Sequence, residues 1–332
     1  MNVADLSTPA LLIDADALEH NLTTMAEVHP GSRLRPHVKA HKCTSLAAQQ
    51  RVHGHRSFTC ATPREVIGMA AAGLGEDLLL ANEVIDHTRL SAMAALQDDS
   101  SITIAVDSEE TIDAAARAGL KYVLIDVNVG LRRCGCTPSD AGHLADRARA
   151  KGLVVRGVMG YEGHVMAMPD RTEQRASVGE AMDKLVVASL LAGGDIISAG
   201  GTDTFDLHDQ VTEIQAGTYA LMDSYYGNRG HPFRQACFVL ATVISSHQDF
   251  AVGDAGLKTQ GMDHGKPTID GMKVFGLSDE HITFAPPAPM AVGERVMVTP
   301  AHIDPTMAMH EVAWLVRGDQ VIDRWPIDLR NW

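Results

Sequence analysis

The chain has 332 residues, of which 45% are hydrophobic and 5% aromatic, and it carries a formal net charge of −14 at pH 7. This composition is sufficient for a large buried core and indicates more than one domain of ordinary size. An acidic surface repels the phosphates of nucleic acids and the headgroups of anionic lipids, so neither nucleic acid nor membrane is an expected partner.

The targeting signals and the cysteines predict a cytoplasmic protein. The longest apolar runs are shorter than a membrane span requires, and residues 1–5 lack the basic start and apolar run of a signal peptide. The five cysteines are irregularly spaced, which does not indicate a disulfide framework. One residue between Cys134 and Cys136 is unusual for zinc ligands, so we expect reduced thiols without a metal.

Strand-like and helix-like stretches alternate through the first two thirds of the chain. Apolar, β-branched runs lie at residues 33–39, 57–62, 77–82, 102–107, 121–129, 153–162, 195–201 and 212–221. Between them lie helix-like stretches such as 44–54, 63–73, 109–119, 139–152 and 171–193. This alternation predicts parallel strands with crossover helices, and eight units in about 200 residues fit a (β/α)8 TIM-type barrel. A doubly wound open sheet is the alternative, although no Gly-x-Gly-x-x-Gly follows the first strand.

The pattern changes near residue 235, where helical periodicity fades and glycine and proline separate short β-like runs. These runs lie at residues 238–245, 273–276, 295–298, 311–317 and 320–324. Residues 10–14 are also strand-like, and we expect them to join this C-terminal sheet because chain termini often lie close together. The sequence therefore predicts a barrel domain at residues 15–234 and an all-β domain at residues 235–332 with residues 1–14.

Reactive side chains follow several of the predicted barrel strands, at the end where such barrels carry their active sites. Lys39 ends the first strand, His164 follows the sixth, residues 200–202 (Gly-Gly-Thr) follow the seventh, and residues 215–219 accompany the eighth. Glycines and hydroxyls suit a phosphate, because backbone N–H groups approach closely where no Cβ intervenes. A lysine amine and a phosphate site at one mouth predict pyridoxal phosphate chemistry, although each motif alone is more often a solvated lysine or a turn.

The C-terminal domain contains a candidate metal pair, His302 and Asp304. On a strand these two side chains point to the same face, so imidazole and carboxylate can share one ion. The mixed nitrogen and oxygen set favours Mn²⁺ or Mg²⁺, with Zn²⁺ also possible. We expect the neighbouring pairs at residues 280–281 and 310–311 to be structural or surface pairs.

With these motifs the sequence resembles the D-threonine aldolase and D-serine dehydratase family, a branch of the fold-type III pyridoxal phosphate enzymes that also includes alanine racemase. The resemblance extends through nearly the whole chain. Its most specific parts are Arg-Pro-His-Val-Lys-Ala-His-Lys at residues 35–42, Gly-Leu-Arg-Arg-Cys-Gly at 130–135, Tyr-Glu-Gly-His at 161–164, Gly-Gly-Thr-Asp-Thr at 200–204 and the final His-x-Asp.

The resemblance implies a role for each matched residue. Lys39 is implied to hold the cofactor as a Schiff base, Arg133 to contact its phenolic oxygen, and His164 to lie beside the pyridine ring as a candidate base. Gln215 stands where racemases place an arginine against the pyridine nitrogen. The phosphate is implied to contact Gly201, Thr202, Gly217 and Thr218.

The resemblance also implies an activity. Related D-serine dehydratases carry His-x-Cys, a softer pair that suits zinc, whereas Asp304 is similar to the aldolases. It therefore implies pyridoxal phosphate- and metal-dependent retro-aldol cleavage of a D-β-hydroxy-α-amino acid such as D-threonine, giving glycine and an aldehyde, by a homodimer. The alternatives are a D-serine or 3-hydroxyaspartate dehydratase, an amino acid racemase, and a non-catalytic pyridoxal phosphate carrier, a class that lacks the β domain.

Overall fold

The computed structural model describes residues 1–227 and 229–332, which form two compact units that we describe separately. The first unit comprises Met1–Met25, Ala40–Leu46 and Thr218–Arg330. The second comprises Ala26–Lys39, Ala47–Gly217 and Asn331–Trp332.

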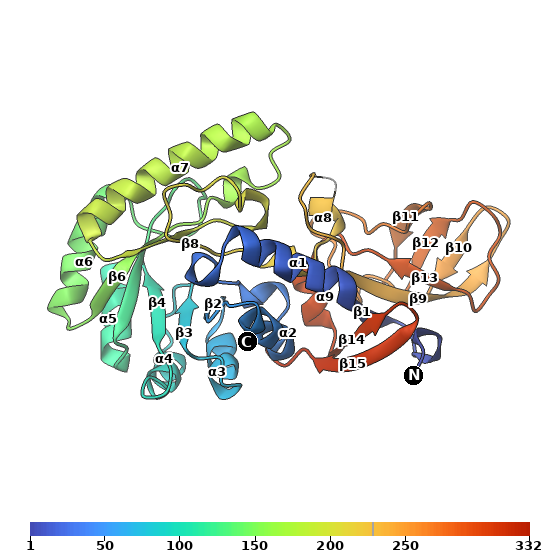
Figure 1. Ribbon diagram of the computed structural model, residues 1–332, viewed down its shortest axis with the longest axis horizontal. Coiled ribbons are helices and arrows are strands. Elements are labelled where there is room, and N and C mark those ends of the chain that lie inside the picture. The colour runs from blue at the N-terminus through green and yellow to red at the C-terminus, as the bar shows by residue number, and fades with distance from the viewer. Residues whose placement is uncertain (228) are drawn as a thin grey trace. The chain divides into compact units, whose positions relative to one another are not determined.

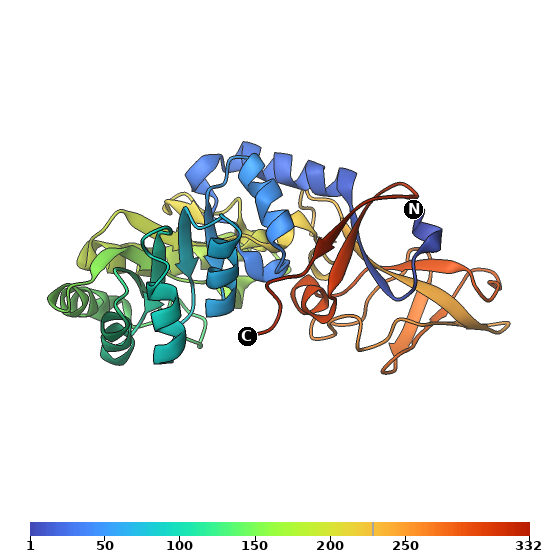
Figure 2. The ribbon, with the colours of Figure 1, turned by 90° about the horizontal axis from the view of Figure 1, so that it is seen from below.

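Among its described residues, the second unit contains a curled sheet of seven parallel strands in sequence order, with helices along its outer side (Figure 1, Figure 2). The strands are β2 (Ser57–Cys60), β3 (Asp77–Leu80), β4 (Ile102–Val106), β5 (Tyr122–Asp126), β6 (Val154–Met159), β7 (Ile196–Ala199) and β8 (Glu213–Ile214). The helices are α2 (Thr44–Val52), α3 (Pro63–Ala71), α4 (His87–Ala94), α5 (Glu109–Ala118), α6 (Ala141–Ala150) and α7 (Arg171–Ala192). The predicted alternation of strand and helix is therefore confirmed.

Local capping signals explain where several of these helices begin and end. The hydroxyl of Thr62 accepts a hydrogen bond from the N–H of Glu65, and Pro63 occupies the first turn of α3, where no N–H is needed. Ser108 caps α5 in the same way, and α5 ends at Gly119, whose φ of 84° favours glycine. Each helix is thus positioned behind the strand that precedes it.

The segment expected as the first barrel strand, residues 33–39, is not a continuous strand. Leu34 forms a single parallel bridge with Ile214 of β8, and His37 forms one with Thr59 of β2. The segment therefore contacts the two outermost strands of the seven-stranded sheet, one on each side.

Pro36 explains why this segment pairs so sparsely. Proline has no N–H to donate to a ladder, and only its carbonyl takes part, accepting from the N–H of Thr59 at 2.9 Å. Short 3₁₀ turns, η2 (Gly31–Arg33) and η3 (Val38–Ala40), flank the bridging residues. The expected eighth strand is also shorter than predicted, because only Glu213–Ile214 pairs as a strand before the 3₁₀ turn η7 (Thr218–Ala220).

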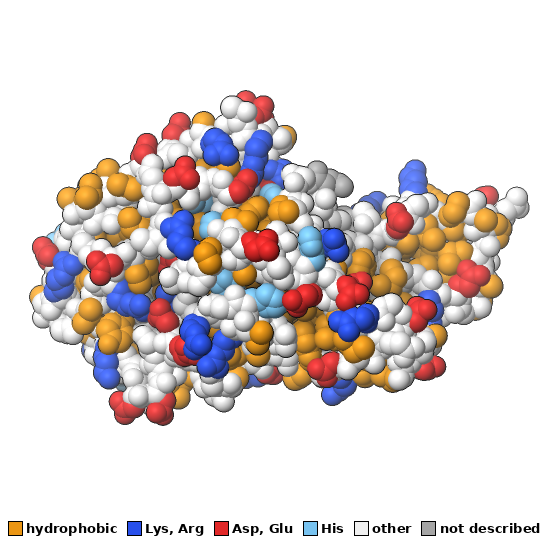
Figure 3. All heavy atoms as spheres, in the orientation of Figure 1, with side chains coloured by type: hydrophobic (Ala, Val, Ile, Leu, Met, Phe, Trp, Pro, Cys, Tyr) orange, Lys and Arg blue, Asp and Glu red, His pale blue; other side chains and the backbone are white. Residues whose placement is uncertain are grey.

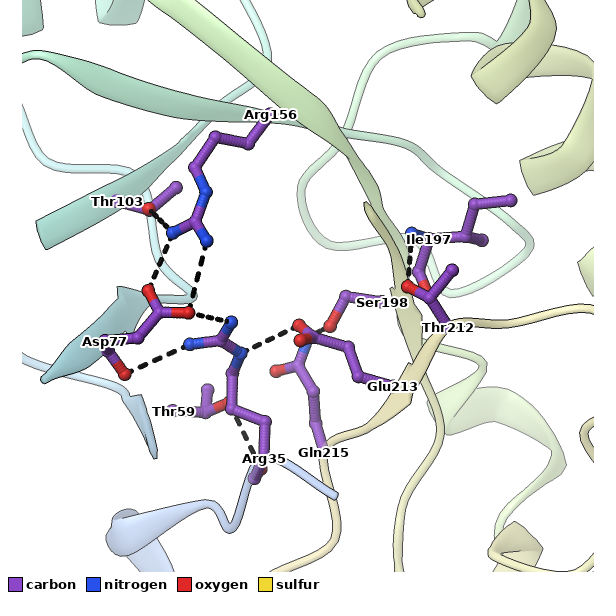
Figure 4. A network of polar contacts seen from close by, with 10 residues as sticks. All are labelled: Arg35, Thr59, Asp77, Thr103, Arg156, Ile197, Ser198, Thr212, Glu213 and Gln215. Atoms are coloured by element: carbon purple, nitrogen blue, oxygen red, sulfur yellow. Dashed lines mark hydrogen bonds and ion pairs between the residues drawn. The ribbon is translucent and has the colours of Figure 1, made fainter. Parts of the chain in front are cut away.

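An ionic network occupies the inside of the sheet at the amino-terminal ends of its strands (Figure 4). Arg35 is buried and donates from Nε to Glu213 at 2.8 Å and from Nη2 to Asp77 at 2.8 Å. Arg156 donates to both carboxylate oxygens of Asp77, at 2.6 and 3.1 Å, and to Thr103 at 2.7 Å. These contacts tie the bridging segment to β3, β4, β6 and β8.

The described part of the first unit contains an eight-stranded sheet in the order β11-β12-β10-β9-β1-β14-β15, with β13 also paired to β9. Its strands are β1 (Ala10–Asp14), β9 (Cys237–Ser246), β10 (Ala251–Gly253), β11 (Lys273–Leu277), β12 (Ile282–Ala285), β13 (Arg295–Val298), β14 (Val312–Arg317) and β15 (Gln320–Pro326). Its helices are α1 (Ala15–Val28), which extends into the second unit, α8 (Ser224–Gly227) and α9 (Ile303–Met309).

Strand β1 lies between two strands from the other end of the chain. It runs antiparallel to β9, where Leu12 faces Phe238, and parallel to β14, where Leu12 faces Trp314. The expectation that residues 10–14 join the C-terminal sheet is confirmed. Two strands of this sheet, β10 and β12, were not expected, because runs of three and four residues give little periodicity. Within the described residues, no helix combines the length and apolar character that crossing a bilayer requires.

Candidate functional site

Lys39 lies at the carboxyl-terminal mouth of the curled sheet. The N–H of His37 donates to the carbonyl of Ala216 at 3.0 Å, so Lys39 comes two residues beyond the last pairing of its segment. Because neighbouring parallel strands end at the same edge, Lys39 and Gly217 leave the sheet on one side. The Lys39 side chain is exposed, as a residue that receives a ligand at this mouth needs to be.

His164, Arg133 and Gly201 are placed near one another by Tyr161 and Gly130. A Cβ on Gly130 would lie 2.4 Å from Cε1 of His164, so the imidazole packs directly on glycine backbone. The guanidinium of Arg133 lies over the Tyr161 ring, 5.5 Å from its centroid, and a Cβ on Gly201 would lie 3.6 Å from the same ring. The turns after β5, β6 and β7 therefore meet at this mouth.

The predicted phosphate residues occupy the loops after β7 and β8. Thr202 begins the 3₁₀ turn η6 (Thr202–Thr204) and is buried, and Gly217 is buried at the end of β8 beside the half-buried Thr218. The N–H of Gly201 donates to the hydroxyl of Thr204 at 3.2 Å and is therefore engaged inside its own loop. Thr218 belongs to the first unit and the other three residues to the second.

Gln215 is buried, and its side-chain amide donates to the hydroxyl of Ser198 at 2.8 Å. It lies two positions after Glu213, so the two side chains share the inner face of the sheet (Figure 4). Ser198 was not expected at the site, because a serine inside a buried strand carries no distinctive pattern. At position 215 this chain therefore has a neutral amide, which is held by the neutral hydroxyl of Ser198.

An acidic cluster that the sequence did not reveal lies at the ends of β3 and β5. Burial and the neighbouring charge of Glu83 raise the pKa of Asp126 well above its ordinary value. Burial and contact with Glu83 raise the pKa of Cys134 to about 12, and burial with the charge of Asp126 raises that of Cys136 to about 12. All five cysteines, which lie in the described part of the chain, are free. Because metals bind thiolates, a raised thiol pKa disfavours metal binding at these cysteines.

The residues at this mouth fit pyridoxal phosphate by their chemistry. Lys39 supplies a primary amine for the aldehyde, Arg133 a cation for the phenolic oxygen, and Thr202 a hydroxyl beside a glycine-rich turn. Gly130 leaves the face of the sheet open where any side chain would collide with His164. The donor set therefore matches both the carbonyl end and the anionic end of the cofactor.

The metal pair lies on a different element from the one expected. His302 caps helix α9 and Asp304 is in its first turn, so the prediction that both lie on a strand was wrong. Pro305 is the third residue of α9, a position where a missing N–H costs nothing, and it marks the helix start. The N–H of Ile303 donates to Asp223 at 3.1 Å, and burial raises the pKa of Asp223 to about 6.

His302 has a carboxylate near each of its ring nitrogens. Nε2 lies 4.0 Å from Oδ1 of Asp304, and Nδ1 lies 2.7 Å from Oδ2 of Asp263. His264 stacks on the His302 ring with centroids 3.8 Å apart, and Asp263, His264 and His302 form a second possible ligand group. Two metal–ligand bonds of about 2.1 Å span up to about 4.2 Å, so one ion can reach both His302 and Asp304, although adjacent ligands would lie closer together than 4.0 Å.

The competing pairs in the first unit are engaged elsewhere. His310 is half-buried, its Nε2 lies 2.8 Å from the carbonyl of Thr259, and burial lowers its pKa. Glu280 pairs with Lys258 at the surface, at 2.7 Å. A cavity of about 580 Å³ in the second unit lies at the opposite end of the strands from Lys39 and is lined by residues of the Arg35 network, so it is not the predicted cofactor site.

Comparisons with known proteins agree with this geometry. Residues 13–225 match the family "Alanine racemase, N-terminal domain", and residues 236–316 match "Putative serine dehydratase domain". The chain is 34% identical to a D-threonine aldolase from Arthrobacter sp, covering 99% of this chain and 94% of the relative. It is 30% identical to a 3-hydroxy-D-aspartate aldolase from Paracoccus denitrificans (strain Pd 1222), covering 100% and 94%.

A dehydratase and a solved aldolase structure are also similar. The chain is 30% identical to a D-threo-3-hydroxyaspartate dehydratase from Delftia sp. (strain HT23), over 78% of this chain and 74% of the relative. The crystal structure of D-threonine aldolase from Filomicrobium marinum superimposes with a TM-score of 0.93 at 33% identity, covering 98% of this chain and 96% of that one. The chain therefore belongs to the D-threonine aldolase and D-serine dehydratase-like family of alanine racemase-fold, pyridoxal phosphate enzymes.

Proposed function

We propose that this chain is a pyridoxal phosphate- and metal-dependent lyase that cleaves a D-β-hydroxy-α-amino acid to glycine and an aldehyde. D-threonine and 3-hydroxyaspartate define the substrate class, because the two aldolases that it resembles over their length are named for these compounds. The observation that carries the proposal is the His302 and Asp304 pair, whose hard oxygen ligand separates this chain from the His-x-Cys dehydratases.

The residues of the second unit hold the cofactor and move protons. When bound, pyridoxal phosphate supplies an electron sink for breaking the bond between Cα and Cβ. Lys39 would hold the cofactor through its primary amine. His164, packed on Gly130, is the candidate base for the substrate's β-hydroxyl proton, a contribution typically worth about 10²–10⁴ in rate.

In the first unit, His302 and Asp304 hold the metal, for which Mn²⁺ or Mg²⁺ is preferred over Zn²⁺. When bound, the ion supplies a Lewis acid that lowers the pKa of the β-hydroxyl.

Arg133 would donate to the phenolic oxygen of the cofactor, and Gly201, Thr202, Gly217 and Thr218 would bind its phosphate. Gln215 offers the pyridine nitrogen a neutral amide, which disfavours a racemase.

The wider assignments are parts of the same proposal. Residues 34–37 act as the first strand and close a (β/α)8 barrel, which the bridges of Leu34 and His37 to opposite edges of the sheet support. The functional barrel spans residues 15–234, and the β domain spans residues 235–332 with residues 1–14. We assign the chain to the cytoplasm, where its free cysteines stay reduced.

Product analysis tests the proposal. Purified protein supplied with pyridoxal phosphate and Mn²⁺ is incubated with D-threonine and, separately, with D-threo-3-hydroxyaspartate. We expect glycine with acetaldehyde or with glyoxylate, and loss of this activity in a chelator. Full activity in the chelator contradicts the metal role, and absence of any turnover contradicts the aldolase.

A dehydratase is the second candidate, supported by the similarity to the Delftia enzyme. It would form 2-oxobutanoate from D-threonine and oxaloacetate from 3-hydroxyaspartate, each with ammonia. Formation of these keto acids without glycine would replace the aldolase proposal. L-amino acid formation would instead indicate a racemase.

A further inference from the structure

Glu162 is a buried carboxylate that joins the two loops carrying His164 and the predicted phosphate residues. It follows β6 and precedes His164 by two residues, and its side chain is fully buried. Its Oε2 accepts the N–H of Gly200 at 3.2 Å, and its Oε1 accepts the hydroxyl of Thr204 at 2.7 Å. Both donors belong to the loop after β7, so one carboxylate holds the first residue of that loop and the end of its 3₁₀ turn η6.

Asp203 makes the reverse connection. This buried residue of the β7 loop accepts the N–H of Ala167 at 2.6 Å and the side-chain amide of Gln174 at 2.6 Å. The same amide of Gln174 donates to the carbonyl of Val165 at 2.9 Å, next to His164. Each loop thus accepts hydrogen bonds from the other through one buried carboxylate, and the two loops are connected in both directions.

His208 completes the environment of Glu162. Its Nε2 lies 2.9 Å from Oε1 of Glu162 and 3.2 Å from the hydroxyl of Thr204, and the side chains of His208 and Glu162 are both fully buried. Nδ1 is buried and has no hydrogen-bond partner among the described residues, so the proton belongs on Nε2. Burial alone would raise the pKa of Glu162, but His208 and Thr204 outweigh it and lower the pKa, which keeps the carboxylate ionised.

Gly200 allows this close arrangement. Its φ of 88° favours glycine, and a Cβ at this position would lie 3.0 Å from Nε2 of His208. A side chain at position 200 would therefore separate His208 from Glu162. Gly200, the first glycine of the Gly-Gly-Thr motif, therefore lies against the buried pair of His208 and Glu162.

We propose that Glu162 is a positioning residue that, through Thr204 and Gly200, fixes the phosphate-binding loop against the turn bearing His164. This inference rests on the proposed function, because it assumes that the cofactor phosphate binds at Gly201 and Thr202. It predicts that cofactor affinity depends on a carboxylate that never touches the cofactor. A carboxylate that served the fold alone would change thermal stability and leave cofactor affinity unchanged.

Four variants test the proposal: Glu162→Gln, Thr204→Val, Thr204→Ser and Asp209→Asn. The first removes the charge, the second removes the hydroxyl at nearly constant shape, and the third retains the hydroxyl. Asp209 is an exposed acid beside His208 and is the matched control. The dissociation constant of pyridoxal phosphate is measured by absorbance titration of each apoprotein, and the ³¹P chemical shift of the bound phosphate is recorded.

We expect Glu162→Gln and Thr204→Val to raise the dissociation constant about tenfold or more and to move the ³¹P resonance, since each loses a charge-assisted hydrogen bond. Thr204→Ser and Asp209→Asn should stay within about twofold of wild type. Thr204→Val removes the bond to Glu162 and also the acceptor for the N–H of Gly201, so a loss in this variant supports the proposal only together with Glu162→Gln. Wild-type affinity in Thr204→Val contradicts the proposal even when Glu162→Gln does not fold.

Two outcomes overturn the inference alone: wild-type affinity in Thr204→Val, or an equal loss of affinity in Thr204→Ser. A wild-type protein that binds no pyridoxal phosphate overturns the proposed function, and the inference with it.

Discussion

Lys39 is the residue on which the cofactor assignment depends, because only a primary amine forms a Schiff base with the aldehyde. We expect wild-type protein with pyridoxal phosphate to absorb in the visible region and Lys39→Ala to lose that band while keeping its circular dichroism spectrum. Lys121→Ala, which removes another exposed lysine of the second unit, should keep the band. An unchanged spectrum in Lys39→Ala would mean that a different amine holds the cofactor.

His302 gives a second residue-level prediction, because its two ring nitrogens face different carboxylates. Nδ1 donates to Asp263 at 2.7 Å, which leaves the lone pair of Nε2 on the side of Asp304. Carboxylates that orient a metal-binding histidine in this way are typically worth about 10–100-fold in metal affinity. We therefore expect Asp263→Asn to weaken metal binding about tenfold, and Asp304→Asn to weaken it more.

Titration of the metal-free protein with Co²⁺, followed by its visible absorption, measures these affinities. Asp270→Asn, which removes an exposed acid of the same unit, is the control and should bind as wild type does. If Asp263→Asn loses as much affinity as Asp304→Asn, then Asp263 is itself a ligand, and the group formed by Asp263, His264 and His302 is the better description of the site.

The sequence predicts Lys39, His164 and Thr202 at one mouth of the sheet. This prediction is possible because the alternation of strands and helices shows which short motifs directly follow a strand. The supporting residues could not be found in this way. Glu162 and His208 are separated by 46 positions, and each is an ordinary polar residue in the sequence until folding buries both. Residue spacing predicts which side chains share a face of one helix or strand. It cannot predict a contact between residues of two different loops.

At the level of elements, Arg35 connects the bridging segment that leads to Lys39 with the sheet. Its guanidinium is buried between Glu213 and Asp77, and removing one member of a buried ion pair typically costs about 3–5 kcal/mol. We expect Arg35→Met to lower the free energy of unfolding of the second unit by this amount. Arg89→Met, which breaks an exposed pair on α4, should change it by about 1 kcal/mol or less.

Urea unfolding of the apoprotein, followed by circular dichroism, measures both effects. A change in Arg35→Met as small as that in Arg89→Met would mean that the network contributes little net stability to the sheet.

The same network predicts a response to acid. Burial alone would raise the pKa of Asp77, but its bonds to Arg156 and Arg35 outweigh burial and lower the pKa below its ordinary value. The stabilisation is therefore complete above about pH 4, the value for an unfolded aspartate, and is lost as the pH falls through the folded pKa. We expect Asp77→Asn to be less stable than wild type at neutral pH and to lose less stability on acidification.

Urea midpoints measured across the acid range test this expectation. Asp98→Asn, at a carboxylate that is 97% exposed, is the control and should follow the wild-type curve. Parallel curves for Asp77→Asn and wild type would show that Asp77 does not titrate with a lowered pKa.

Most elements could be predicted from periodicity and caps, and the exceptions have local causes. Strands β2 to β7 were expected where they occur, because buried apolar runs between capped helices leave few alternatives. Pro36 interrupts the first expected strand, and the helix at Ile303–Met309 replaces a strand because Pro305 favours a helix start. Whether such a short segment becomes a strand depends on its pairing with residues far away in the chain. The local sequence does not specify that pairing.

For the whole molecule, the resemblance implies a homodimer. Figure 3 shows hydrophobic side chains gathered over strands β9 to β13 of the first unit, where Ile244, Phe275 and Met297 are 43%, 45% and 39% exposed. Exposed apolar side chains of this kind often mark interaction surfaces. We expect light scattering after size-exclusion chromatography to give the mass of two chains, and a single-chain mass at all concentrations would contradict this.

The position of β1 between β9 and β14 has a consequence for biosynthesis. Residues 10–14 are synthesised well before the strands that cover both of their edges, which begin at Cys237 and Val312. At about 5–20 residues per second, the first of these partners is translated roughly 10–45 s later. During that interval an apolar strand has no native neighbour, so we expect a chaperone or a temporary contact to cover it until Val312–Arg317 is made.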